Sequence, residues 1–290
     1  MKQNKYAAPD RSGEGGGWMK QNTKIGLVLS GGGAKGAYEA GVWAGLQKLG
    51  VTDSIDGIIG SSVGALNAVL FDTCDLERAE DIWLKLKKSD LLYFSKAEAL
   101  AAVVNPIYTM IRTSAFLFLL KGGFSQKRLD EIIKKYVDFS RSKRSLYAVC
   151  THATDFTLSE VFCLEEFEPA LRKDIILASA ALPLVYKGIF GAQINGTGYL
   201  DGGLSDNTPR MKLRAEGWRH TITVWLTDKP EADALSDDGN IDIVPSHSIG
   251  NFLTGTIRVN KKKLREDYEL GLSDTLRLKS RLLAMTKEVK

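Results

Sequence analysis

Two segments near the beginning of the chain each combine a short apolar run, a glycine-rich turn and a helical pattern. The first apolar run, residues 25–29, leads into Ser30-Gly-Gly-Gly-Ala-Lys-Gly36, and the second, residues 55–59, leads into Gly60-Ser-Ser-Val-Gly64. Apolar runs without polar alternation are typical of strands buried on both faces. A strand–helix–strand–helix order favours parallel strands with right-handed connections. The sequence therefore predicts a three-layer α/β/α domain with a central, mostly parallel sheet.

Further helices and strands are predicted from periodicity and from capping residues. Asp75 and Ser125 are helix caps of a preferred kind, and Pro169 suits the first turn of a helix. The predicted strands at 146–151 and 160–164 follow each other closely enough to pair as a hairpin. The predicted helices cover residues 37–49, 65–71, 76–87, 126–137, 169–180, 249–253 and 261–283, and one more strand covers 221–226.

Composition and charge narrow the functional classes. A chain of 290 residues with 44% apolar and 26% charged residues is typical of a globular protein. Its net charge of +4 is too weak to predict a nucleic-acid partner, which requires a concentrated basic face. We expect one domain over residues 24–290, after a polar, glycine-rich flexible leader at 1–23. The sequence leaves the oligomeric state open.

The cysteines and the apolar runs indicate the cellular compartment in which we expect the protein. Cys74, Cys150 and Cys163 are irregularly spaced, so they predict neither a disulfide framework nor a zinc site. They favour reduced thiols in the cytoplasm. The first residues lack the apolar core of a secretory signal, and the unbroken apolar run at 115–120 is far shorter than the ~20 residues of a membrane span. We expect a cytoplasmic protein, with peripheral membrane contact left open.

The second glycine motif contains a candidate nucleophile. Gly60-Ser61-Ser62-Val63-Gly64 matches the pattern G-x-S-x-G between a predicted buried strand and a predicted helix. Such a turn exposes the Oγ of its central serine, and the flanking glycines relieve crowding. The N-terminus of the following helix favours negative charge on that oxygen. Ser62 is therefore the candidate nucleophile; an ordinary glycine-serine turn is the alternative, because the pattern alone is weakly specific.

The first glycine motif allows two interpretations. Gly31, Gly32, Gly33, Ala34, Lys35 and Gly36 match G-x-G-x-x-G after a strand, a pattern typical of dinucleotide binding. That site needs an acid near the end of the second strand, whereas Asp53 and Asp56 precede or open that strand. A Walker phosphate loop is excluded because no Gly-Lys-Ser/Thr follows. An oxyanion hole made of successive backbone N–H groups is the interpretation that the neighbouring serine turn favours.

A candidate base follows much later in the chain. Asp201-Gly202-Gly203 comes directly after a strand-like stretch, with two glycines that leave the carboxylate little side-chain cover. An aspartate is a poor base at its ordinary pKa near 4, so Asp201 would need a shielded position to act on Ser62. A surface turn is the alternative, because Asp-Gly is common in such turns.

Together, in this order and spacing, the motifs resemble the patatin-like phospholipases. The resemblance covers nearly all of residues 24–290. It rests on the two glycine motifs, on Ala178-Ser-Ala-Ala-Leu-Pro183, and on Asp201-Gly-Gly203 with Asn207 and Pro209 behind it. It implies a lipid acyl hydrolase of the phospholipase A or lysophospholipase type, with phospholipid or lysophospholipid as substrate and without a metal or cofactor.

Carried over by position, the resemblance implies a Ser–Asp dyad. Ser62 would attack the ester, Asp201 would take its proton, and residues 31–36 would hold the oxyanion on the way to an acyl-serine. Lys35 would help to attract an anionic head group. Two other functions compete with this one, namely a nucleotide-dependent oxidoreductase that uses the glycine-rich segment and a catalytically idle lipid-binding module.

Three histidines and one apolar segment are further candidates for a functional role. His220 or His247, after Ser62 and Asp201, would give the chain order of an α/β-hydrolase triad, and His152 ends a predicted strand. The dyad resemblance implies that all three are dispensable for chemistry. The apolar segment 107–120 is either a lipid-facing surface or a core helix.

Overall fold

The computed structural model describes residues 22–86, 126–181, 192–230, 239–251, 255 and 260–289. Within these residues, eight strands form one sheet in the order β5-β6-β3-β2-β1-β7-β8, and β4 pairs with β3 outside that path. The strands are β1 (Asn22–Leu29), β2 (Ile55–Ser61), β3 (Ser145–His152), β4 (Ser159–Cys163), β5 (Ala192–Ile194), β6 (Thr197–Asp201), β7 (Trp218–Val224) and β8 (Asn240–Ile243).

The centre of the sheet is parallel, as predicted. β1 lies between β2 and β7, and the parallel pairing continues from β2 to β3 and from β7 to β8. Beyond β3 the sheet becomes antiparallel through β4, β6 and β5, and the predicted hairpin is the β3–β4 pair. We call the edge at which β1, β2 and β3 end the carboxyl edge, and the edge at which they begin the amino edge.

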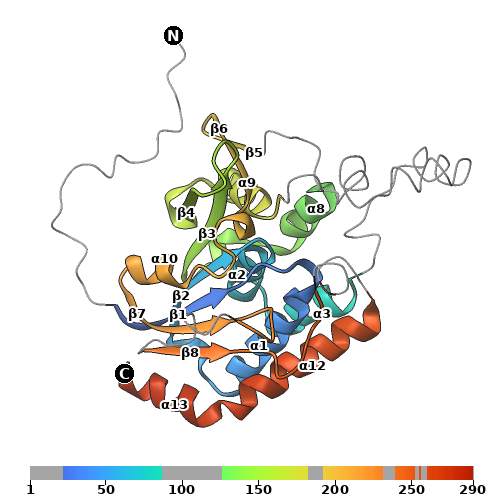
Figure 1. Cartoon of the computed structure of the whole chain (residues 1–290), viewed down its shortest axis with the longest axis vertical. Coiled ribbons are helices and arrows are strands. Elements are labelled where there is room, and N and C mark those ends of the chain that lie inside the picture. Colours follow the sequence, from blue (N-terminus) through green and yellow to red (C-terminus); the bar gives the residue numbers. More distant parts are fainter. Residues whose placement is uncertain are drawn as a thin grey trace, which may run out of the picture.

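Helices cover both faces of the sheet (Figure 1). On one face, α1, α2, α9 and α12 pack around a large apolar cluster that includes Leu27 and Ile58. On the other face, Val28 packs with Leu213 of α10 and with Trp218. The helices are α1 (Gly36–Lys48), α2 (Val63–Thr73), α3 (Leu76–Leu84), α8 (Gln126–Tyr136), α9 (Pro169–Ser179), α10 (Arg210–Ala215), α12 (Lys261–Arg277) and α13 (Lys279–Glu288).

Capping residues and hydrophobic periodicity predicted the ends of most of the expected helices and strands to within a few residues. The Asp75 side chain accepts the N–H of Arg78 at the start of α3, and Pro169 opens α9, both as predicted. β1 begins at Asn22, inside the predicted leader, because its backbone pairs with β7 at Trp218. None of the described helices is both long and apolar enough to cross a membrane.

Two helix predictions were wrong. Residues 249–251 are not helical, because Gly250 adopts a left-handed backbone conformation with φ of 94°. The helix expected over 261–283 is two helices that meet at Leu278; the Thr275 hydroxyl donates to the Gly271 carbonyl one turn earlier, a contact that bends helices. The apolar segment 107–120, Ser125, residues 182–183 and residues 252–253 lie outside the described residues.

Candidate active site

Ser62 occupies a sharp turn between β2 and α2. Its backbone has φ of 54° and ψ of −121°, an uncommon conformation for a residue with a side chain, which costs roughly 1–3 kcal/mol. The turn is tight enough to exclude side chains on both sides: a Cβ at Gly60 would lie 2.1 Å from the Gly64 backbone, and one at Gly64 would lie 2.5 Å from the Leu29 carbonyl. The two glycines of the motif are therefore required by close backbone approach.

Asp201 lies directly against Ser62. The Ser62 Oγ donates to Asp201 Oδ2 at 2.7 Å, and the other carboxylate oxygen, Oδ1, accepts the Gly203 N–H at 2.8 Å. Both side chains are buried, Asp201 almost completely. Asp201 is the last residue of β6, so the antiparallel extension of the sheet carries it to the end of the parallel strands. The structure thus brings together the two residues that the sequence analysis paired, which are 139 positions apart.

Burial changes the acidity of Asp201. Desolvation raises the pKa of its carboxyl to about 7, although the hydrogen bonds from Ser62 and from the Gly203 backbone favour the charged form. A carboxylate with this pKa is a far better proton acceptor near neutral pH than an exposed aspartate. The shielded position that the sequence analysis required for a base is therefore present.

The first glycine motif runs beside Ser62. A Cβ at Gly31 would lie 3.2 Å from Ser62 Cβ and 2.3 Å from Asn207 Oδ1. The Gly31 N–H donates to the Asn207 carbonyl, and the Asn207 side-chain amide donates back to the Gly31 carbonyl. The Gly31 amide is therefore committed to this contact, whereas the sequence analysis counted it among the oxyanion donors. The motif ends in a short 3₁₀ turn, Gly33–Lys35, before α1.

The Lys35 side chain lies inside the domain, whereas the sequence analysis expected it to help to attract an anionic head group. Its side chain is only 9% exposed, and its Nζ donates to the Leu226 carbonyl at 3.1 Å. Burial lowers the pKa of this amine, and the charge of Lys263 lowers it further. The side chain thus ties the start of α1 to the segment that follows β7.

The three histidines do not contact Ser62. His152 ends β3 with its Nε2 3.2 Å from the Glu160 carboxylate, His220 lies on β7, and His247 is exposed in the loop after β8. The Ser62 hydroxyl donates to Asp201 instead. Over the part of the chain that the structure describes, no three histidine, cysteine, aspartate or glutamate side chains gather closely enough to hold a metal ion.

Ser179 was not singled out as a functional residue by the sequence analysis. This residue ends α9, and its buried hydroxyl accepts the Ser62 N–H at 3.0 Å while donating to the Val149 carbonyl at 2.7 Å. Its position inside the Ala178–Pro183 motif was the available signal. That motif indicated family resemblance without indicating which partner the serine contacts.

A second polar group missed from sequence lies behind the glycine motif. Glu39 of α1 is completely buried, and its Oε2 accepts a hydrogen bond from Asn67 of α2. Asn67 also donates to the Gly36 carbonyl and accepts from the Trp83 indole. The other oxygen, Glu39 Oε1, is buried without a partner in the described structure. Burial raises the pKa of Glu39 to about 8, so the carboxyl is largely protonated at neutral pH.

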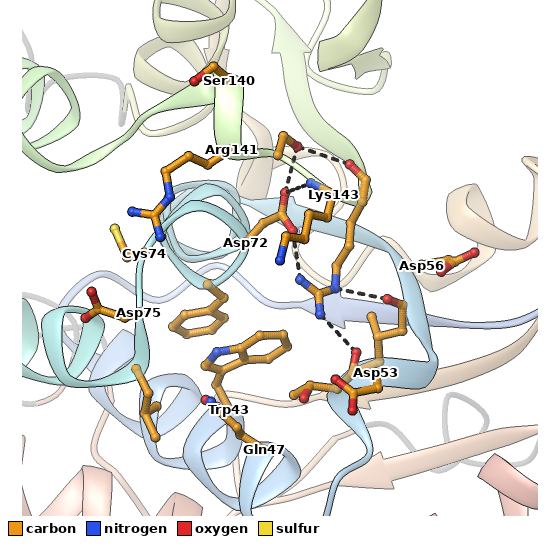
Figure 2. Close-up of a pocket in the computed structure, with 16 residues that line it drawn as sticks. Trp43, Gln47, Asp53, Asp56, Asp72, Cys74, Asp75, Ser140, Arg141 and Lys143 are labelled. Atoms are coloured by element: carbon orange, nitrogen blue, oxygen red, sulfur yellow. Dashed lines mark hydrogen bonds and ion pairs between the residues drawn. The ribbon is translucent and has the colours of Figure 1, made fainter.

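A cavity of about 680 Å³ opens at the amino edge, away from Ser62 (Figure 2). The Arg144 guanidinium pairs with Asp72 at 2.8 Å and donates to the carbonyls of Ile55 and Thr52. Beneath it, the rings of Trp43 and Phe71 stack with centroids 5.2 Å apart. The Arg144 and Asp72 charges of this cavity are therefore paired with each other. The cavity also contains a serine–aspartate hydrogen bond, from the Ser142 hydroxyl to Asp72 at 2.6 Å, but there the carboxylate is bound to an arginine.

A serine and an aspartate that share a hydrogen bond at the carboxyl edge of parallel strands, beside a glycine-rich turn, define a class of α/β domain. Residues 27–213 match the patatin-like phospholipases, and the chain belongs to that family. The resemblance stated from the motifs is thereby confirmed.

Individual relatives are more distant. Lysophospholipase NTE1 of Saccharomyces cerevisiae is 28% identical over 211 residues, which make up 72% of this chain and 11% of that protein. Lysophospholipase NTE1 of Meyerozyma guilliermondii is 26% identical over 238 residues, 81% of this chain and 14% of that protein. The chain therefore spans a small part of the length of these relatives. VipD from Legionella pneumophila shares the fold, with a TM-score of 0.54 at 16% identity over 89% of this chain and 67% of that chain.

Proposed function

We propose that this domain hydrolyses carboxylic ester bonds in phospholipids or lysophospholipids through an acyl-serine intermediate. The observation that carries the proposal is the 2.7 Å hydrogen bond from Ser62 Oγ to Asp201 Oδ2 in a buried site. Family membership and the lysophospholipase relatives support a lipid ester as the substrate.

The chemistry follows from this contact. Asp201 accepts the Ser62 proton as Oγ attacks the ester carbonyl carbon, and the carbonyl oxygen becomes an oxyanion. The amides of Gly32, Gly33 and Ala34, which follow the committed Gly31 amide, are the donors proposed for that oxyanion. The proton passes to the departing alcohol and leaves an acyl-serine. Asp201 then takes a proton from water, and the resulting hydroxide attacks the acyl carbon. Asp201 returns that proton to Ser62 Oγ as the bond between Oγ and the acyl carbon breaks, which releases the fatty acid and restores the serine.

Two further interpretations of the glycine motif and the serine are less well supported. A dinucleotide site would need an acid at the end of β2, but β2 ends at the fully buried Ser61. A lipid-binding module without catalysis would not need a serine in a strained backbone conformation against a carboxylate, since such strain is typical of functional groups.

Peripheral contact with a lipid surface forms part of the proposal. Phe156 and Leu158 each expose more than half of their surface in the turn between β3 and β4, and β3 ends at the carboxyl edge, where Ser62 lies. Replacing both by serine should reduce sedimentation with phosphatidylcholine vesicles, while Met211→Ser, which removes an exposed apolar side chain from α10, should not. Equal binding by the two variants would contradict this part of the proposal.

A fluorophosphonate probe tests the nucleophile. The wild-type protein should become labelled at Ser62, and Ser62→Ala should abolish both labelling and release of fatty acid from lysophosphatidylcholine. Ser61→Ala is the matched control, because the Ser61 hydroxyl is buried without a hydrogen-bond partner in the described structure. Label on Ser61, or hydrolysis by the Ser62→Ala protein, would overturn the proposal.

A further inference from the structure

The C-terminus of α9 contacts both members of the Ser–Asp pair. Ser179, the last residue of the helix, is completely buried, and its hydroxyl accepts the Ser62 N–H at 3.0 Å. The same hydroxyl donates to the Val149 carbonyl on β3 at 2.7 Å. Both the donor and the acceptor capacity of one side chain are therefore used to connect the serine turn to the neighbouring strand.

The second contact of this segment reaches the aspartate. Two residues after Ser179, the Ala181 carbonyl accepts the Asp201 N–H at 2.9 Å. The Asp201 carbonyl in turn accepts the Thr151 hydroxyl of β3 at 2.8 Å. Residues 179–181 therefore hold the backbone of Ser62 through a side chain and the backbone of Asp201 through a carbonyl, so that both are fixed relative to one short piece of chain.

The serine turn needs such support. Ser62 has a positive φ, and relaxation of this backbone would rotate Oγ away from the carboxylate. Its N–H is buried, so a rotated or unpaired amide would lose a hydrogen bond without gaining water. Nothing in the G-x-S-x-G motif supplies this partner. It comes from a residue 117 positions further along the chain.

We propose that Ser179 is a positioning residue for ester hydrolysis, which holds Ser62 in the strained backbone conformation that directs Oγ at Asp201. The inference rests on the proposed function. Ser179 bonds to the backbone of Ser62 and acts on the reaction only through the Ser62 side chain. Its removal should therefore impair the chemical step more than the binding of substrate.

Two isosteric variants isolate the hydroxyl. Ser179→Thr keeps the hydroxyl and Ser179→Val replaces it, while both add similar volume to the same buried position. We expect kcat of Ser179→Val to be lower than that of Ser179→Thr by roughly 10- to 100-fold, because small displacements of a reacting atom have effects of that size. KM should change little. Thr73→Val, which removes a buried hydroxyl bonded to a carbonyl at the far end of α2, is the matched control and should retain wild-type kcat.

The pH profile separates positioning from loss of folding. The hydrogen bond from Ser62 lowers the pKa of Asp201, so weakening that bond should raise the pKa and shift the rising limb of kcat to higher pH. A merely structural role would reduce the amount of folded protein and leave the limb in place. Equal kcat for the Thr and Val variants, or an unshifted limb in Ser179→Val, would overturn the inference. If Ser62→Ala still hydrolysed lysophosphatidylcholine, the proposed function itself would fail instead.

Discussion

The two edges of the sheet use charged groups in opposite ways. At the carboxyl edge, Asp201 is buried with a serine hydroxyl and a backbone amide as its partners, and among the described residues no basic side chain contributes to its pKa. At the amino edge, Asp72 is just as buried but pairs with Arg144 and also accepts the Ser142 hydroxyl (Figure 2). At the carboxyl edge, burial raises the pKa of Asp201 to about 7.

This difference indicates which property distinguishes the proposed active site. The amino-edge cavity is large and rich in charged residues, yet the carboxylate at its centre is neutralised by an arginine that is itself held by two backbone carbonyls. Desolvation destabilises the charged form of Asp201 and so raises its pKa. The carboxylate can therefore accept a proton near neutral pH. A choice by cavity volume and number of charged residues would select the amino edge instead of the proposed active site.

The largest expected effect comes from removing the basicity of Asp201. Asp201→Asn keeps the size of the side chain, and we expect fatty-acid release to fall by roughly 10²-fold or more. In the wild-type protein, activity should rise with pH around 7, because Asp201 must lose its proton to act as a base. Initial rates between pH 5 and 9 measure both effects. Near-normal turnover by Asp201→Asn would return this residue to the class of ordinary turn residues.

At the amino edge the main effect should be on stability. Arg144→Ala leaves the buried Asp72 carboxylate without its ion pair, so we expect the free energy of unfolding to fall by about 2–3 kcal/mol, less than for a fully buried pair because the arginine is partly exposed. Lys143→Ala, on the exposed rim, should change it little. Urea denaturation measures both variants, and kcat per folded molecule should be unchanged. A loss of kcat per folded molecule in Arg144→Ala would contradict this expectation, because it would mean that the ion pair at the amino edge affects the Ser62–Asp201 pair.

Glu39 tests whether desolvated carboxyls destabilise the domain. The folded-state pKa of about 8 lies above the ordinary value of 4.5, so the stability associated with the protonated form decreases as pH rises through this window. Glu39→Gln mimics the neutral acid and should be more stable than wild type at pH 8 by about 1 kcal/mol or more, equivalent to one unit of pKa shift. The difference should shrink toward pH 5. A constant difference between the two pH values would contradict the assignment.

The smallest effect is expected for the histidines. Alanine at His152, His220 or His247 should leave turnover within about tenfold of wild type, because the serine proton has an aspartate as its acceptor and not an imidazole. The pH profile cannot replace these variants, since burial brings the pKa of Asp201 close to that of histidine. Loss of turnover in a folded His247→Ala or His220→Ala protein would indicate a triad and would overturn the dyad.

Sequence was informative where structure is local. The β2–turn–α2 unit follows from an apolar run, two glycines and a serine that are neighbours in the chain, and the Asp75 cap contacts a residue three positions away. Glycines at positions 60 and 64 indicated a tight turn, which the close backbone approach between them explains.

The contacts that sequence could not supply connect distant segments. Nothing in the spacing indicated that Asp201 would arrive on an antiparallel strand, that Asn207 would bind the Gly31 amide, or that Ser179 would hold Ser62. The burial of the Lys35 side chain could not be predicted either, because its partner, the Leu226 carbonyl, lies 191 positions away. Periodicity reports which face of an element is buried, and it does not report what that face meets.

The place of β1 in the sheet has a consequence for protein synthesis. β1 leaves the ribosome well before one of its two neighbours, β7, which ends at Val224. Asp201 and Asn207 also belong to this late part of the chain. Such long-range pairing delays folding until the partner has been made. A growing chain therefore cannot bring Ser62 and Asp201 together in the completed sheet until β6 and β7 have been translated.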